Sequence, residues 1–205
     1  MRGFFLTLEG PEGSGKSSQS RWLAKALRRH GCRVVLLQDP GSTALGRRLR
    51  AALLHSTLPL TPLAEALLFI GARVQLVEER IRPALAKGCV VVCDRFHDST
   101  MAYQGFGGRL DVAWLQRVGR AAIGQTMPSL TILLDVPTER GFARLKRSRD
   151  RMERKTLAFH RRVRQGFLRL AAREPRRFIT INALRTPDDL RRNIETVVMS
   201  RLKRR

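Results

Sequence analysis

The chain contains too little cysteine for a disulfide framework. Its 205 residues include three cysteines, an odd number. Cys89 and Cys93 stand four positions apart in an expected strand, which puts them about 13 Å apart and beyond the reach of a disulfide bond. No group of His and Cys residues has the spacing of a zinc site. We therefore expect all three cysteines, Cys32 included, to be small buried side chains.

Long hydrophobic runs are also missing. No apolar stretch approaches the roughly 18–20 residues that a membrane-spanning helix needs. The stretch at Phe4–Leu8 is too short for the core of a signal peptide and runs directly into Glu9. We expect a cytoplasmic protein without a membrane partner. The hydrophobic fraction of 43% and the charged fraction of 28% are ordinary for a globular domain, which excludes wholesale disorder.

Acidic residues are few. The chain has 17 Asp and Glu against 40 Lys and Arg, a formal net charge of +23, and only six of the basic residues are lysine. A charge of this sign attracts polyphosphates, nucleic acids and acidic surfaces alike. It predicts anionic partners without choosing among them, and any nucleic-acid affinity that it supplies would be non-specific.

Short apolar runs alternate with segments of helical periodicity, and no repeat or linker interrupts them. This pattern is typical of βα units on a parallel sheet and predicts a single α/β domain over residues 1–205. The expected strands are Phe4–Glu9, Arg33–Leu37, Cys89–Cys93, Leu130–Val136 and Phe178–Asn182. The expected helices are Lys16–His30, Leu45–Leu54, Pro62–Lys87, Asp111–Ile123, Thr138–Arg147, Lys155–Arg173 and a last helix capped by Thr186.

A glycine-rich loop follows the first expected strand and opens the first expected helix. Residues 10–17, Gly-Pro-Glu-Gly-Ser-Gly-Lys-Ser, fit the pattern G-x-x-x-x-G-K-[ST] in its proper context. Glycines let backbone amides curl round an anion, and the helix N-terminus adds partial positive charge. We expect Lys16 to reach the outer phosphates of ATP and the Ser17 hydroxyl to face Mg²⁺. The alternative is a plain glycine-rich turn with an exposed lysine. The residues expected to bind ATP are Gly10, Glu12, Gly13, Ser14, Gly15, Lys16, Ser17 and Ser18.

A second polar element is the pair Asp94-Arg95 at the end of an apolar strand. Ligands of parallel α/β sheets bind outside the carboxyl ends of the strands. Asp94 should therefore emerge beside the glycine-rich loop and, with Ser17, hold Mg²⁺ directly or through water. Arg95 should point into the same crevice and pair with phosphate. The alternative is a strand-end aspartate that caps a turn.

The segment from Asp94 to Gly105 resembles the signature of thymidylate kinases, in which Asp-Arg is followed by Ser and then by Ala-Tyr-Gln-Gly. Residues 9–13, 65–73 and 150–162 are similar to the loop, base-binding helix and lid of that family, so the resemblance covers nearly the whole chain. It implies a P-loop NTPase fold, a five-stranded parallel sheet flanked by helices on both faces, with a lid at about residues 144–156. It also suggests a homodimer, for which the apolar helix at Leu63–Val77 could supply a face.

The resemblance implies transfer of the γ-phosphoryl group of ATP to dTMP with Mg²⁺. Phe69 would stack on thymine, Arg73 would hydrogen-bond the base, and Tyr103 would pack against the sugar. On the residues alone, Phe69 could equally be a core aromatic and Arg73 a solvated helix charge. The implied catalytic residues are Glu12, Lys16, Asp94, Arg95 and Arg149. The implied dTMP-binding residues are Asp39, Phe69, Arg73, Arg95, Ser99, Thr100, Tyr103 and Gln104. The implied lid arginines that close on ATP are Arg147, Arg149 and Arg151.

One position departs from the family pattern. Gln38 stands where an arginine that grips the acceptor phosphate is expected. Loss of one charged contact costs ~1.5–3 kcal/mol, about ten- to a hundred-fold in binding, which Arg47 or Arg48 could offset. Three functions stay open: a kinase for dTMP or a modified deoxypyrimidine monophosphate, a nucleic-acid-binding NTPase suggested by the charge of +23 and the basic tail, and a weakly active relative, suggested by Gln38, that binds nucleotides as a sensor.

Overall fold

A five-stranded parallel sheet forms the centre of the computed structural model, which describes residues 3–57, 59–145 and 150–203. Its strands follow the order β2-β3-β1-β4-β5, and every neighbouring pair is parallel. The expected sheet is confirmed, and no strand end differs from its expected position by more than one residue. The strands are β1 (Phe4–Glu9), β2 (Val34–Gln38), β3 (Val90–Asp94), β4 (Leu130–Asp135) and β5 (Phe178–Asn182).

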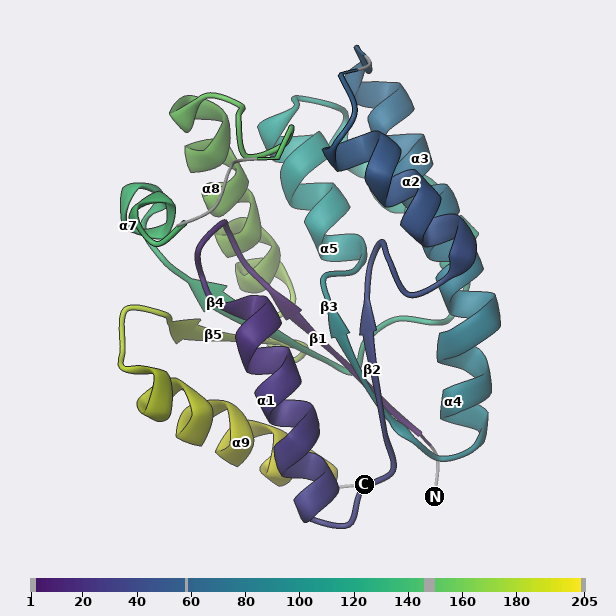
Figure 1. The fold of residues 1–205 in the computed structure, drawn as a ribbon, viewed down its shortest axis with the longest axis vertical. Coiled ribbons are helices and arrows are strands. Elements are labelled where there is room, and N and C mark those ends of the chain that lie inside the picture. Colours follow the sequence, from purple (N-terminus) through teal and green to yellow (C-terminus); the bar gives the residue numbers. More distant parts are fainter. Residues whose placement is uncertain (1–2, 58, 146–149, 204–205) are drawn as a thin grey trace.

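Helices cover both faces of the sheet (Figure 1). Side chains alternate along a strand, so successive residues of β1 face opposite layers. Leu6 packs in a core with Leu23 of α1 (Lys16–Arg29) and with residues of α9 (Pro187–Lys203). Phe5 packs on the other side with Leu76 of α3 (Pro62–Leu76). A third core lies between α2 (Ala44–Leu54), α3, α6 (Val112–Ile123) and α8 (Leu157–Arg173).

The long helix expected at residues 62–87 is not uniform. It consists of α3, a π-helical turn η1 (Val77–Ile81) and α4 (Arg82–Ala86). A further helical segment was missed: α5 (His97–Thr100) continues into a second π-helix, η2 (Met101–Gly107). Glycine is a poor helix former, so propensity argues against a helix here. Packing overrides it, because a Cβ at Gly107 would lie 2.7–2.9 Å from Val163 and Phe159 of α8.

Two helices begin later than expected because a residue expected inside the helix is its N-cap. Asp111 and Thr156 precede α6 and α8, and their side chains accept hydrogen bonds from the first-turn amides. Thr186 accepts one from Asp189 N at 3.2 Å, as expected for the start of α9. α7 (Thr138–Ala143) ends earlier than the expected Arg147, which lies outside the described residues.

The cysteine expectation was partly wrong. All three are free, but only Cys93 is buried, whereas Cys32 and Cys89 are half-buried. Cys89 also precedes β3 instead of belonging to it. In the described ranges, no helix combines the length and apolar character that crossing a membrane would require.

Candidate functional site

The glycine-rich loop connects β1 to α1. Gly13 and Gly15 have φ angles of 68° and 89°, a region that favours glycine. A Cβ at Gly13 would lie 1.9 Å from the carbonyl oxygen of Gly141 in α7, so the loop is packed tightly on that side. A Cβ at Gly15 would meet nothing within 4 Å. The loop therefore has one fixed side and one open side where a ligand can approach its amides.

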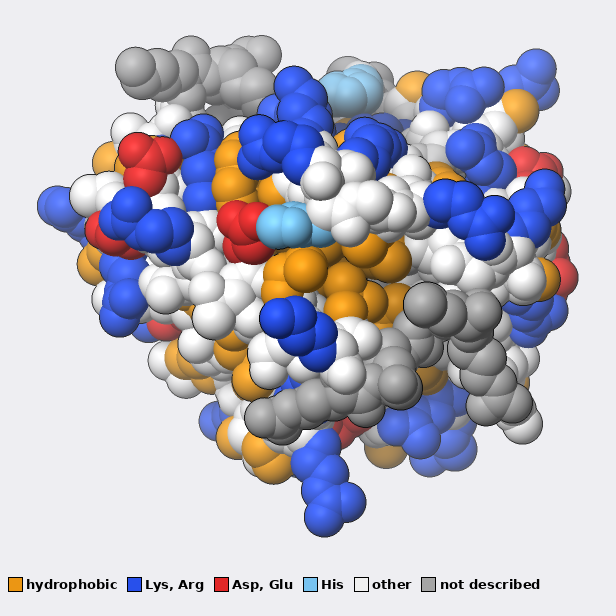
Figure 2. All heavy atoms as spheres, turned by 90° about the horizontal axis from the view of Figure 1, so that it is seen from below, with side chains coloured by type: hydrophobic (Ala, Val, Ile, Leu, Met, Phe, Trp, Pro, Cys, Tyr) orange, Lys and Arg blue, Asp and Glu red, His pale blue; other side chains and the backbone are white. Residues whose placement is uncertain are grey.

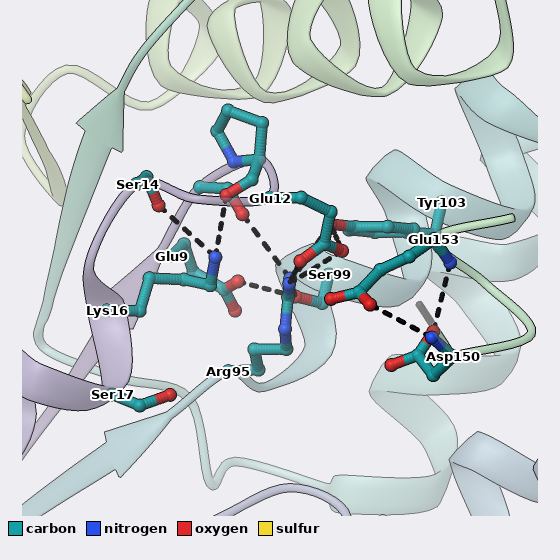
Figure 3. Close-up of polar contacts among 12 residues, drawn as sticks. Glu9, Glu12, Ser14, Lys16, Ser17, Arg95, Ser99, Tyr103, Asp150 and Glu153 are labelled. Carbon is teal, nitrogen blue, oxygen red and sulfur yellow. Dashed lines mark hydrogen bonds and ion pairs between the residues drawn. The ribbon is translucent and has the colours of Figure 1, made fainter. Parts of the chain in front are cut away.

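Lys16 is the first residue of α1, and its side chain reaches back to this loop. It is 6% exposed, and its Nζ donates to Pro11 O at 2.7 Å and to Ser14 Oγ at 3.2 Å (Figure 3). Burial, together with the nearby Arg95 charge, lowers the pKa of Lys16 to about 8, although neighbouring carboxylates oppose the shift. The alternative of a plain turn with an exposed lysine is wrong. The ammonium group is held where a phosphate on the loop would meet it.

Asp94 and Ser17 meet at the start of α1. Asp94 ends β3, opposite Leu8 of β1, and its Oδ2 accepts a hydrogen bond from Ser17 Oγ. Carboxylate and hydroxyl oxygens are hard ligands that suit Mg²⁺. No group of three or more His, Cys, Asp or Glu side chains in the described part of the chain could hold a metal. Ser17 and Asp94 are two oxygen donors of the kind that Mg²⁺ prefers, so the residues present fit that ion.

Arg95 links the end of β3 to the glycine-rich loop (Figure 3). Its φ of 67° is unusual for a residue with a side chain. The guanidinium donates to both carboxylate oxygens of Glu12 at 3.1 Å, to Ser99 Oγ at 3.1 Å and to Tyr103 Oη at 3.0 Å. Tyr103 Oη in turn donates to Glu12 Oε1 at 2.5 Å. Expected residues from the loop, from the position after β3, from α5 and from η2 therefore form one hydrogen-bonded cluster.

Two buried carboxylates in this cluster have opposite pKa shifts. Burial raises the pKa of Glu12, but Arg95 and Lys16 outweigh burial and lower it to about 2. Burial and the charge of Asp98 raise the pKa of Glu9 to about 8. Glu9 accepts hydrogen bonds from Phe96 N at 2.7 Å and from Ser99 Oγ at 2.6 Å. Glu9 was not among the expected site residues, and its position at the end of β1, next to the loop, was the available signal.

Arg73 is a buried residue of α3 and not a solvated helix charge. It is 2% exposed, and its Nε donates to Asp39 Oδ2 at 2.5 Å and its Nη2 to Thr100 Oγ1 at 2.9 Å. Its Nη1 has no hydrogen-bond partner among the described residues. Burial raises the pKa of Asp39 even though Arg73 opposes the shift. The Nη1 group, which carries two N–H donors, is thus buried at the site without a protein partner among these residues.

A cavity of about 480 Å³ is lined both by the cluster round Arg95 and by the pair of Arg73 and Asp39. This volume is in the range of small-molecule sites. Phe69 lies half-buried in its wall. The expected residues that line the cavity are Glu12, Gly13, Gly15, Lys16, Ser17, Ser18, Asp39, Phe69, Arg73, Asp94, Arg95, Ser99, Thr100, Tyr103 and Gln104. Gly10 and Ser14 do not line it but belong to the same loop.

The region round Gln38 holds an arginine that the sequence analysis did not select. Gln38 ends β2 and lines the cavity, and so does Arg50 of α2, whose Nη1 donates to Pro40 O at 3.0 Å. Arg47 and Arg48 are exposed and do not line the cavity. Arg50, and not the two expected residues, is the arginine of α2 that reaches the site.

Of the three lid arginines that were expected to close on ATP, one lies among the described residues. Arg147 and Arg149 lie outside the described residues. Arg151 was expected on the ATP side, but its Nε donates to Leu53 O at 2.7 Å and its Nη2 to Glu65 Oε2 at 2.6 Å, which fixes it to α2 and α3. Asp150 and Glu153 line the cavity and bond each other's backbone amides at 3.0 and 2.9 Å (Figure 3).

Comparisons with known proteins agree on one family. The family model described as Thymidylate kinase matches residues 8–194. A thymidylate kinase of Synechococcus sp. (strain JA-2-3B'a(2-13)) is 48% identical over 198 residues, 97% of this chain and 95% of that protein. One of Deinococcus radiodurans is 45% identical over 202 residues, 98% of each. The crystal structure of thymidylate kinase from Ehrlichia chaffeensis aligns with a TM-score of 0.80 and 31% identity, over 97% of this chain and 99% of that one.

Proposed function

Because the chain belongs to the thymidylate kinase family, we propose that it transfers the γ-phosphoryl group of ATP to dTMP in the cavity described above. The observation that carries this function is the meeting of Lys16 and the glycine-rich loop with Phe69 and Arg73 in one cavity. Phosphoryl transfer needs the two nucleotides in line and positive charge round the moving group. The cavity supplies the positive charge through Lys16 and Arg95, and it places the glycine-rich loop and Phe69 on separate elements round one space.

On the donor side, the amides of residues 13–18 and Lys16 hold the phosphates of ATP. Ser17 and Asp94 would hold Mg²⁺, which would neutralise charge on the phosphates. Lys16 exchanges its hydrogen bond to Pro11 O for one to a phosphate oxygen, a stronger charge-assisted contact. The family uses ATP, generally with Mg²⁺, and these assignments to single residues are our proposal.

On the acceptor side, Phe69 stacks on the thymine ring and Arg73 donates its remaining Nη1 hydrogen atoms to the base. Arg95 binds the acceptor phosphate, and the cluster with Glu12 and Tyr103 orients its guanidinium for that contact. Because these partners hold Arg95 before the substrate arrives, little orientational freedom is lost in the reaction.

The oligomeric state and the location of the protein are further proposals. We propose a homodimer, supported by the exposure of Leu63 and Leu67 on α3, at 45% and 47%. Analytical ultracentrifugation of the chain and of Leu67→Arg tests it, and an unchanged mass for the variant would exclude this helix face. A cytoplasmic location also remains a prediction.

The rival nucleic-acid hypothesis finds little support on the face that Figure 2 shows. In Figure 2 the basic side chains of one face stand in separate groups round an apolar area and do not form a continuous track. Several arginines pair with carboxylates, such as Arg164 with Asp135 at 2.8 Å. On the face shown, the charge adds non-specific attraction for anions and does not outline a groove for a strand.

The test is a coupled assay of ADP release with dTMP, dUMP, dCMP and dGMP as acceptors. We expect turnover with dTMP, and a loss of about 10²–10³ in kcat for Lys16→Ala because one preorganised donor is removed. Lys25→Ala, an exposed lysine of the same helix, is the matched control and should keep full activity. ATP hydrolysis that only DNA or RNA stimulates would establish the nucleic-acid NTPase, and dTMP binding without turnover would establish the sensor.

A further inference from the structure

A buried carboxylate outside the hydrogen-bonded cluster of Arg95, Glu12 and Tyr103 connects two parts of the site. Glu65, in the first turn of α3, is 1% exposed. Its Oε1 accepts from Gln104 Nε2 at 2.8 Å, and its Oε2 accepts from Arg151 Nη2 at 2.6 Å. Lys155 Nζ lies 3.2 Å from Oε1 and 3.4 Å from Oε2. The phosphate chemistry described above does not use this carboxylate.

The contact with Glu65 fixes which way the amide of Gln104 faces. An ionised carboxylate only accepts hydrogen bonds, so it must face the NH₂ group of the amide. The opposite orientation would place two acceptor oxygens about 2.8 Å apart without a proton between them. Gln104 is buried and lines the cavity, so the amide carbonyl oxygen, Oε1, is the group left for a ligand.

We propose that Glu65 is a positioning residue that sets base selectivity by holding Gln104 with its carbonyl oxygen available to the acceptor base. This inference rests on the proposed dTMP kinase function. Thymine and uracil carry a donor, N3–H, on the ring edge, whereas cytosine presents a bare acceptor nitrogen there. A fixed carbonyl oxygen accepts from the first two and opposes the third.

Arg151 and Lys155 complete the arrangement. They belong to the segment that follows residues 146–149, and both pair with Glu65 as ion pairs of 2.6 and 3.2 Å. Because these cations occupy the remaining acceptor positions, the carboxylate cannot turn away from Gln104. The residue that contacts the base is therefore linked, through one carboxylate, to the segment that packs over α2 and α3.

The decisive variant is Glu65→Gln. The new amide has one oxygen, which Arg151 and Lys155 attract, so its NH₂ group turns to Gln104 and reverses that amide. We expect the ratio of kcat/KM for dTMP over dCMP to fall roughly tenfold to a hundredfold. The ratio for dTMP over dUMP should stay unchanged, because both bases present the same N3–H. An equal loss of kcat/KM for dTMP, dUMP and dCMP would overturn the proposal, since a purely structural role of Glu65 predicts that result.

Two more variants make the result specific. Glu78→Gln is the matched control: the same substitution in η1, at a side chain that is 54% exposed and pairs with Arg82, should change no ratio. In a Gln104→Met background, Glu65→Gln should no longer alter the dTMP over dCMP ratio. A persisting effect would show that Glu65 does not act through Gln104 and would refute the proposal.

A second substitution covers the case in which Glu65→Gln does not fold. Glu65→Asp keeps the charge for Arg151 and Lys155 but withdraws the acceptor from Gln104, so the dTMP over dCMP ratio should fall while thermal melting stays near that of the parent. An unchanged ratio would refute the proposal. Absence of dTMP turnover in the parent enzyme would instead refute the proposed function, so the two failures are distinct.

Discussion

The ion pair of Arg73 with Asp39 gives the sharpest test of the site's energetics. The two side chains are 2% and 0% exposed, and the pair closes at 2.5 Å. Arg73→Met removes the cation and leaves the buried carboxylate of Asp39 without its ion-pair partner. Breaking one side of a buried pair costs about 3–5 kcal/mol, against a typical total stability of about 5–15 kcal/mol. We expect the variant to fold with much reduced stability.

The double variant Asp39→Asn with Arg73→Met separates charge from packing. Replacing both partners by neutral groups leaves no buried charge, so most of the lost free energy of unfolding should return. The single Arg73→Met variant should also depend on pH. Burial already raises the pKa of Asp39, and loss of Arg73 raises it further, so its stability deficit should be smaller at about pH 5 than at about pH 8.

Urea unfolding followed by fluorescence of Trp22 and Trp114 measures these differences. Activity adds an independent readout, because the double variant should regain stability but not kcat/KM for dTMP, since both variants lack the Nη1 donor. A cost below about 1 kcal/mol for Arg73→Met, or a double variant as unstable as the single one, would show that the pair does not stabilise the fold as a buried ion pair.

Phe69→Ala should weaken dTMP binding by about 5- to 100-fold through loss of base stacking, with ATP affinity within about twofold in separate titrations; equal losses for both nucleotides would assign Phe69 to the core. Gln38→Arg should lower the KM for dTMP about tenfold or more by adding a charged contact to the phosphate, and an unchanged KM would show that Arg50 already supplies that contact. Glu9 has a folded pKa near 8 against an ordinary value of 4.5, so its contribution to stability is present at low pH and is lost as the pH rises through 8. Glu9→Gln should therefore flatten the decline in urea midpoint between about pH 5 and pH 9, and a decline equal to that of the parent would assign it to other groups.

Short local patterns predicted a large part of the fold and site. The strand, loop and helix round Lys16 lie within one continuous segment, and the glycine spacing by itself predicts a phosphate-binding loop. Asp94 was placed correctly because the carboxyl ends of parallel strands meet at one edge. Such features need only neighbours in sequence or a rule of sheet topology.

Contacts between distant segments were not predictable in the same way. Glu12 lies 83 residues from Arg95, and Glu65 lies 39 from Gln104, so nothing in the spacing indicates that they touch. Arg50 was missed because which turn of α2 faces the cavity depends on how that helix packs on α3. The π-helix η2 was missed because its glycines disfavour a helix and tertiary packing against α8 decides the outcome.

The tight approach of Gly13 to Gly141 limits how this gene can vary. A methyl group at Gly13 would reach within 1.9 Å of the Gly141 oxygen, and one at Gly141 would reach within 2.2 Å of the Glu12 oxygen. Glycine has no side chain to shorten, so neither residue can make room for a side chain on the other. A mutation at one position therefore has no compensating mutation across the contact. An evolving lineage must keep both glycines together or move the whole of α7 away from the loop.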